Sequence, residues 1–175
     1  MLMRSTPAPD TNPGTEKHTN SKPQLSLIGA ASSLGCPKSG CEQSPEQLQK
    51  LGLIETLEMN GIAAHWETLL KTIPGPSVTQ AVAEFSQRLA ASVAKQLADK
   101  QFFAVIGGDH SCAIGTWNGV YDARQGEPFG LIWVDAHMDS HTPKSSHSGA
   151  LHGMPLAALL GFGDEALTGL AQPGP

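Results

Sequence analysis

Apolar and polar positions alternate along the chain with two different periods, which predicts strands that alternate with helices. Short, almost wholly apolar runs, typical of buried strands, lie at Leu25–Ala31, Phe102–Ile106 and Phe129–Val134. A weaker run at Ile62–Trp66 predicts another short strand. Between these runs, apolar residues spaced by three or four over 78–97 predict an amphipathic helix.

Two further helices are predicted from their boundaries. Ser44 is a candidate N-cap, Pro45 suits the first helical position, and Gln47 is placed to complete a capping box. The helix that they begin is expected to continue until Asn60-Gly61 ends it. Another helical stretch is expected after Ser111.

This order of elements predicts an α/β fold, because parallel strands need crossover connections and these are usually helices. We expect a three-layer α/β/α arrangement with a parallel sheet over residues 24–175. Residues 1–23 hold several prolines and polar residues and little that is apolar, so they are predicted to form a disordered leader.

Three residues that can bind a metal follow the third apolar run. Asp135, His137 and Asp139 alternate with Ala136 and Met138. In an extended backbone, side chains two residues apart point the same way, so these three can converge on one point. The alternative is a polar loop in which an aspartate caps the next helix. A cluster of ionisable groups at a buried strand end is costly unless it is paired or bound to a metal.

A second group follows the strand predicted at Phe102–Ile106. Gly107-Gly108 permits a tight turn that leads to Asp109 and His110. The carboxyl ends of parallel strands lie at one edge of the sheet, where ligands usually bind, so both groups are expected to meet there. Asp109 is a candidate for orienting a neighbouring group, although Asp109 or Ser111 serving only as an N-cap is an alternative. Mixed carboxylate and imidazole ligands favour Mn²⁺, Fe²⁺ or Co²⁺.

Composition excludes several other functions. The 175 residues include 11 basic and 16 acidic residues, a net charge of -5, without a basic run, which argues against nucleic-acid binding. No apolar stretch approaches the roughly 20 residues of a membrane span, and no secretory signal is recognisable. Three cysteines without a C-x-x-C pair are interpreted as reduced thiols, so a cytoplasmic location is expected.

The motifs together resemble one enzyme family. Ile106-Gly107-Gly108-Asp109-His110-Ser111, Trp133-Val134-Asp135-Ala136-His137-Met138-Asp139 and Ser148-Gly149-Ala150-Leu151-His152-Gly153 are similar to motifs of the arginase/agmatinase (ureohydrolase) family. The similarity is closest to arginases and extends from about Leu25 to Leu160. It implies two Mn²⁺ ions bridged by hydroxide at the end of a parallel sheet, which hydrolyse a guanidino compound.

The resemblance also implies roles for individual residues. Its metal ligands would be His110 for one ion, His137 for the other, Asp135 as the bridging carboxylate, and Asp139 as a further ligand of the ion held by His110. His152 resembles the histidine that transfers a proton near the leaving group. Relatives are commonly trimers or hexamers, so a homo-oligomer is expected.

The substrate-binding positions agree less closely with arginases. Ser148 lies where arginases contact the α-carboxylate of the substrate. His141 stands where arginases usually have an asparagine, and is either a substrate contact or a plain loop histidine. Ala150 also replaces a common asparagine, and His147 is interpreted as a loop histidine. Arginine is the expected substrate, with agmatine or formiminoglutamate as alternatives.

A later part of the family pattern has no counterpart here. Relatives carry a Ser-x-Asp-x-Asp type segment that completes both metal shells, whereas nothing after His152 matches it. The chain is therefore expected to represent the N-terminal part of the family fold, with the C-terminal half missing and four of six metal ligands present. An inactive metal-binding or partner-binding module is the alternative, and a metal-dependent amidohydrolase is a third interpretation.

Overall fold

A parallel sheet with helices on both faces forms the framework of the protein. The structure is a computed structural model, and residues 24–170 are described. In this part of the chain the strands are β1 (Leu25–Ala31), β2 (Ala64–Lys71) and β3 (Phe102–Gly107). The helices are α1 (Ser44–Lys50), α2 (Leu53–Met59), α3 (Val78–Ala98), α4 (Cys112–Ala123), α5 (Pro155–Leu159) and α6 (Glu165–Thr168), with 3₁₀ turns at Cys41–Gln43 and Leu151–Gly153.

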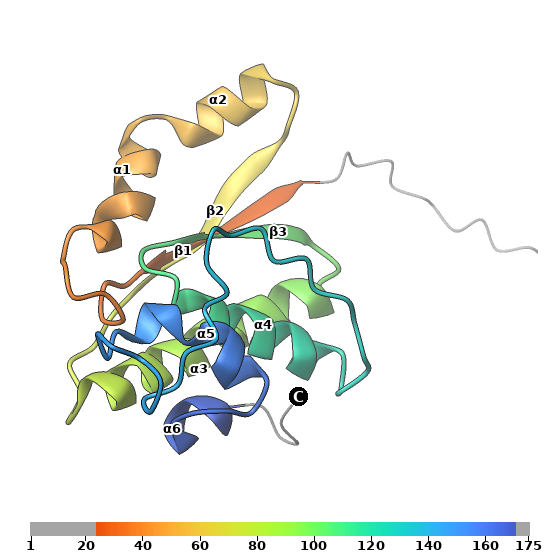
Figure 1. Ribbon diagram of the computed structural model, residues 1–175. Helices are drawn as coiled ribbons and strands as arrows, with labels where there is room; N and C mark the ends of the chain where they lie inside the picture. The colour runs from red at the N-terminus through yellow and green to blue at the C-terminus, as the bar shows by residue number, and fades with distance from the viewer. Residues whose placement is uncertain (1–23, 171–175) are drawn as a thin grey trace, which may run out of the picture.

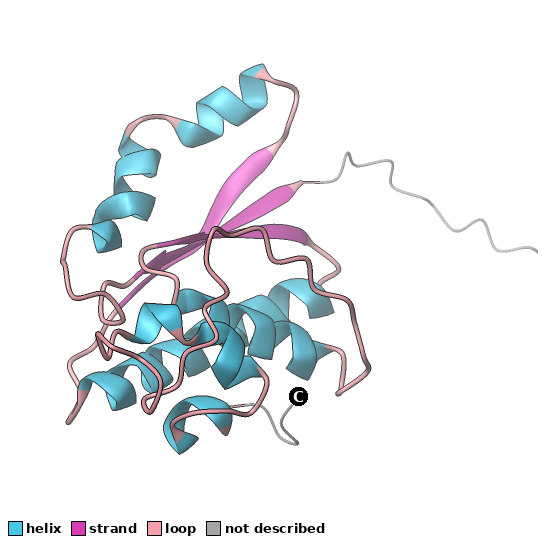
Figure 2. Ribbon diagram, in the orientation of Figure 1, coloured by secondary structure: helices cyan, strands magenta, loops and turns pink. Residues whose placement is uncertain are grey.

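The strands have the order β2-β1-β3, and both pairings are parallel. Helices α1 and α2 connect β1 to β2, and α3 connects β2 to β3. Figure 1 shows α1 and α2 on one face of the sheet and α3 and α4 on the other, and Figure 2 shows the same three layers by type of element. The predicted α/β/α fold with a parallel sheet is confirmed.

One of the two core clusters lies between the sheet and α3. Ile28 and Ala30 of β1 are fully buried against Phe85, Leu89 and Val93. This set explains the apolar spacing in α3, since residues three or four apart share one face of a helix. Helix α4 packs beside α3, and a Cβ at Gly115 of α4 would lie 2.6 Å from the carbonyl oxygen of Ser86. Glycine therefore permits the close contact of these two helices.

The first predicted helix is wrong in two details. It is divided into α1 and α2, because Gly52 adopts a left-handed conformation with φ of 75°. Ser44 is not an N-cap, since the 3₁₀ turn at Cys41–Gln43 continues directly into α1 and the backbone N–H of Ser44 already donates to Cys41. The predicted end at Asn60-Gly61 is confirmed.

The second strand lies later in the chain than predicted. It was expected at Ile62–Trp66 but begins at Ala64 and continues to Lys71. The backbone N–H of Ile62 donates to the carbonyl of Leu57 at 2.9 Å, so it takes part in ending α2 rather than in the sheet.

The strand predicted at Phe129–Val134 is the largest error. This segment forms no strand and appears in Figure 1 as part of the long teal coil after α4. Its side chains alternate: the ring of Phe129 stacks on Trp117 with centroids 6.2 Å apart, and Trp133 contacts His110, whereas Ile132 and Val134 are 88% and 92% exposed. A buried parallel strand needs packing on both faces and a hydrogen-bonded neighbour, and this run has packing on one face only.

Two other expectations concern residues 1–23 and membrane-spanning helices. The predicted disordered leader, residues 1–23, lies outside the described residues. Over residues 24–170, none of the helices combines the length and the apolar character needed to cross a membrane.

The core packing gives a first test. Leu89 is fully buried and Leu51 is 77% exposed. We expect Leu89→Ala to lower the free energy of unfolding by about 2–5 kcal/mol, because it leaves a cavity between α3 and the sheet. The control Leu51→Ala should change it by less than about 0.5 kcal/mol. Urea unfolding followed by circular dichroism measures both, and equal effects of the two variants would contradict the packing described here.

The thiols give a second test. Burial raises the pKa of the Cys112 thiol to about 12, and the nearby Asp109 carboxylate adds to this effect. Because the thiolate is the reactive form, iodoacetamide at about pH 8 should modify Cys36 in the native protein while leaving Cys112 unmodified. In urea both should react, and peptide mass spectrometry reports each site. Equally rapid labelling of Cys112 in the native protein would show that this thiol is not buried between α4 and β1.

Candidate metal centre

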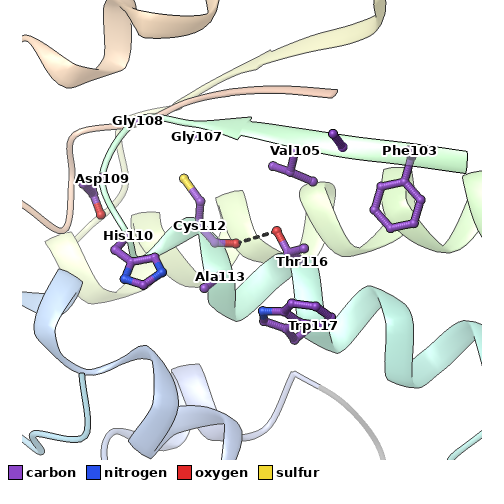
Figure 3. A pocket seen from close by; sticks show the side chains of 11 residues that line it. Phe103, Val105, Gly107, Gly108, Asp109, His110, Cys112, Ala113, Thr116 and Trp117 are labelled. Atoms are coloured by element: carbon purple, nitrogen blue, oxygen red, sulfur yellow. Dashed lines mark hydrogen bonds between the residues drawn. The ribbon is translucent and has the colours of Figure 1, made fainter. Parts of the chain in front are cut away.

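The turn after β3 brings its polar residues to the end of the sheet. The backbone N–H of Gly108 donates to the carbonyl of Ala30 at 2.9 Å, and that of Asp109 donates to Ser32 at 2.8 Å. A Cβ at Gly108 would lie only 1.9 Å from the carbonyl oxygen of Ser32, so no other residue fits without moving the backbone. Figure 3 shows Asp109 and His110 on this turn, between β3 and the start of α4.

The second segment, Asp135–Asp139, is a loop that is fixed at both ends. A side-chain oxygen of Asp135, Oδ1, accepts a hydrogen bond from the backbone N–H of His137 at 2.8 Å. Asp139 has φ of 49°, a left-handed conformation that aspartate tolerates better than most residues. Its carbonyl accepts the N–H of Leu156 in the first turn of α5 at 2.9 Å, which holds the end of the loop against that helix.

Three of the four predicted metal ligands converge. Nδ1 of His110 lies 2.5 Å from Oδ2 of Asp139 and 3.2 Å from Oδ2 of Asp135. The three donor atoms lie within 4.8 Å of one another. The carboxylate of Asp139 is buried, whereas His110 and Asp135 are open to solvent on one side. Two carboxylates and an imidazole at this spacing can hold one divalent cation.

His137, the fourth predicted ligand, lies at the margin of this group. Its Nδ1 is 3.2 Å from Oδ1 of Asp135, whereas His110 lies near the other oxygen, Oδ2. The His137 side chain is 81% exposed and does not belong to the convergent set. Its backbone N–H is the main cause of a lowered pKa of Asp135, with smaller contributions from both histidine rings, so Asp135 is a carboxylate at neutral pH.

The predicted catalytic and substrate-binding residues share a cavity with these ligands. The cavity has a volume of about 700 Å³, and its lining includes all seven predicted site residues: His110, Asp135, His137, Asp139, His141, Ser148 and His152. Met138, Ser140 and Gly153 complete the wall. Sequence patterns placed only the four candidate metal ligands at two predicted strand ends, and the family resemblance added His141, Ser148 and His152. In the structure all seven line one cavity.

Hydrogen bonds fix several of these side chains. Nδ1 of His152 lies 3.0 Å from the carbonyl oxygen of Gly35, and Nδ1 of His141 lies 3.2 Å from Oγ of Ser145. The hydroxyl of Ser148 accepts the backbone N–H of Ala150 at 3.2 Å. Gly35 and Ser145 were not identified from the sequence. The only local signal for Gly35 was its place in the Gly- and Ser-rich loop that follows the first strand.

A second cavity adjoins the metal group. It has a volume of about 600 Å³ and lies between β3 and α4, where Figure 3 shows Phe103, Val105, Thr116 and Trp117 along its walls. It is bounded by the edge of β3 that has no strand neighbour among residues 24–170. His110 lines both cavities, so the metal group stands at the junction between them.

Comparison of sequences identifies relatives for this arrangement. The sequence profile of the Arginase family matches residues 23–172. An arginase of Bacillus caldovelox is 42% identical over 158 residues, which are 82% of this chain and 51% of the relative. Human Arginase-1 is 38% identical over 144 residues, covering 78% of this chain and 44% of the relative.

Solved structures agree with the sequence comparison. The crystal structure of arginase from Bacillus subtilis matches 84% of this chain with a TM-score of 0.75 and 36% identity, over 50% of its own length. Entamoeba histolytica arginase in complex with L-ornithine matches 84% with a TM-score of 0.76 and 32% identity, over 52% of its length. The chain thus spans about half the length of the curated relatives it matches. By its sequence, its fold and the two motifs that meet at the sheet edge, this chain belongs to the arginase family.

Proposed function

We propose that this chain carries the metal-binding and proton-transfer residues of a hydrolase that converts arginine to ornithine and urea. The observation that carries the proposal is the convergence of His110, Asp135 and Asp139 in the cavity that His152 also lines. Family membership supports hydrolysis of a guanidino compound, and the L-ornithine in the Entamoeba histolytica structure supports arginine among such compounds.

The residues present fit a divalent cation. His110, Asp135 and Asp139 would hold one ion, and His137, whose Nδ1 lies 3.2 Å from the other oxygen of Asp135, would bind a second. Oxygen and imidazole donors without a thiolate suit Mn²⁺, the ion implied by the family resemblance. Bound divalent ions lower the pKa of a coordinated water, which supplies a nucleophile at neutral pH.

The remaining side chains would bind and protonate the substrate. His152 would give a proton to the departing amine nitrogen, the transfer that general acid catalysis requires when urea separates from ornithine. Ser148 and His141 would bind the α-carboxylate end, since both line the same cavity as His152. The carboxylate of Asp135 stays ionised through its bond with the His137 N–H, so it neutralises charge on the cation rather than taking up a proton.

Two residues favour a second substrate. His141 and Ala150 stand at positions where arginases usually have asparagine, which favours another guanidino substrate such as agmatine. A metal-binding module without activity of its own is the alternative to hydrolysis. A cytoplasmic location and assembly into a trimer or hexamer complete the proposal.

Metal affinity tests the convergent group. Titration calorimetry with MnCl₂ should show binding, and His110→Ala should weaken it by at least about 10–100-fold, the loss seen when even an outer partner of a ligand is removed. His147→Ala is the matched control: His147 is an exposed histidine of the same region that does not line the cavity, so the variant should bind as tightly as the parent. Equal affinity of all three proteins would exclude this site.

Urea release tests the reaction. The purified chain with Mn²⁺ should release urea from arginine faster than from agmatine, and His152→Asn should lower the rate by about 10²–10⁴-fold because the proton donor is lost. His147→Asn should keep the parent rate. Faster release from agmatine would reassign the substrate. Manganese binding without urea from either compound would favour the inactive module.

A further inference from the structure

Gly35 connects two side chains that lie far apart in the sequence. Its backbone N–H donates to Oδ2 of Asp109 at 2.9 Å, across 74 residues. Its carbonyl oxygen accepts the backbone N–H of His152 at 3.0 Å and faces Nδ1 of the same histidine at 3.0 Å, across 117 residues. Gly35 belongs to the loop that follows β1, residues 32–40, called here the β1 loop. This single residue therefore lies between a buried carboxylate and the proposed proton donor.

Asp109 is held firmly at its end of this chain of contacts. The residue is 7% exposed, and its second oxygen, Oδ1, accepts the backbone N–H of Ser111 at 2.8 Å. Because each of its oxygens accepts a different backbone N–H, Asp109 fixes both the start of α4 and the position of Gly35. The N-cap interpretation of Asp109 thus describes only one of its two oxygens.

The contact requires glycine at position 35. A Cβ there would lie 2.5 Å from Oδ1 of Asp109 and 2.7 Å from Oγ of Ser111. Any side chain would push the β1 loop away from Asp109, and the carbonyl that meets His152 would move with it.

The contact also determines which nitrogen of His152 carries the proton. A carbonyl oxygen only accepts hydrogen bonds, so Nδ1 of His152 must be the protonated nitrogen of the neutral ring. Nε2 then holds the lone pair, and among residues 24–170 it has no hydrogen-bond partner. It is the nitrogen that is available to take up and deliver a proton.

We propose that Asp109 is a positioning residue: through the Gly35 backbone it holds His152 as the Nδ1–H tautomer and leaves Nε2 for proton transfer. The tautomer follows from the hydrogen bonds alone, and only its use in the reaction rests on the proposed function. Asp109 does not line the cavity that holds His152, so it acts on His152 through Gly35.

The experiment is long-range ¹H–¹⁵N NMR of the full chain labelled at its histidine rings. At about pH 8.5, two units above the ordinary histidine pKa of about 6.5, the two tautomers are distinguished by their nitrogen shifts. We expect His152 to be mainly Nδ1–H. Asp109→Ala removes both acceptor oxygens, so the Gly35 N–H loses its partner and the Nδ1–H to Nε2–H ratio should fall roughly fivefold, the effect of one hydrogen bond.

Asp164→Ala is the matched control. Asp164 also accepts a backbone N–H, that of Ala166 at 2.9 Å, but it does so at the start of α6 and outside the loop. This variant should leave the ratio of the Nδ1–H to the Nε2–H tautomer of His152 unchanged. His147 serves as an internal reference in every sample.

Two results would overturn the proposal. A parent protein in which His152 is mainly Nε2–H would exclude the contact with Gly35, and this measurement needs no variant. A folded Asp109→Ala with an unchanged ratio would exclude the role of Asp109. If that variant does not fold, Gly35→Ala breaks the same contact from its other side and should lower the ratio as well. Failure to bind Mn²⁺ or release urea would contradict the proposed function and leave the tautomer result standing.

Discussion

The close contact between the ends of β1 and β3 is the constraint on which the site depends. The strands are parallel and in register up to Ala30 and Gly107, so their loops leave the sheet at the same level. Gly108 then passes so close to Ser32 that a Cβ would overlap the carbonyl oxygen. This contact aligns the β1 loop with the turn that carries Asp109 and His110. His110 and, through Gly35, His152 are positioned from these two loops, whereas Asp139 is held by the first turn of α5.

The parts predicted correctly from the sequence are those set by local patterns. The apolar run of β1, the spacing in α3 and the glycines after β3 each determine their own structure within a few residues. The run at Phe129–Val134 looked equally apolar, but whether such a run becomes a strand depends on neighbours far along the chain. Among residues 24–170 only one of its faces finds packing, against α4 and His110.

The same distinction applies to the candidate site. The spacing of Asp135, His137 and Asp139 predicted convergence, and two of them do meet His110. His137 does not, because the loop is not extended as a strand would be, and Asp139 turns through a left-handed conformation. The contacts of Gly35 with Asp109 and His152 span 74 and 117 residues, and no local pattern indicates them. Only the folded chain brings these residues together.

The central claim is that the ends of these two motifs form a metal centre in this chain. The most direct measurement is a crystal structure of the protein grown with MnCl₂, with diffraction data collected to show the anomalous signal of manganese. We expect an anomalous peak between Nδ1 of His110 and the carboxylates of Asp135 and Asp139. A map with no peak there, at saturating Mn²⁺ and with these side chains ordered, would contradict it.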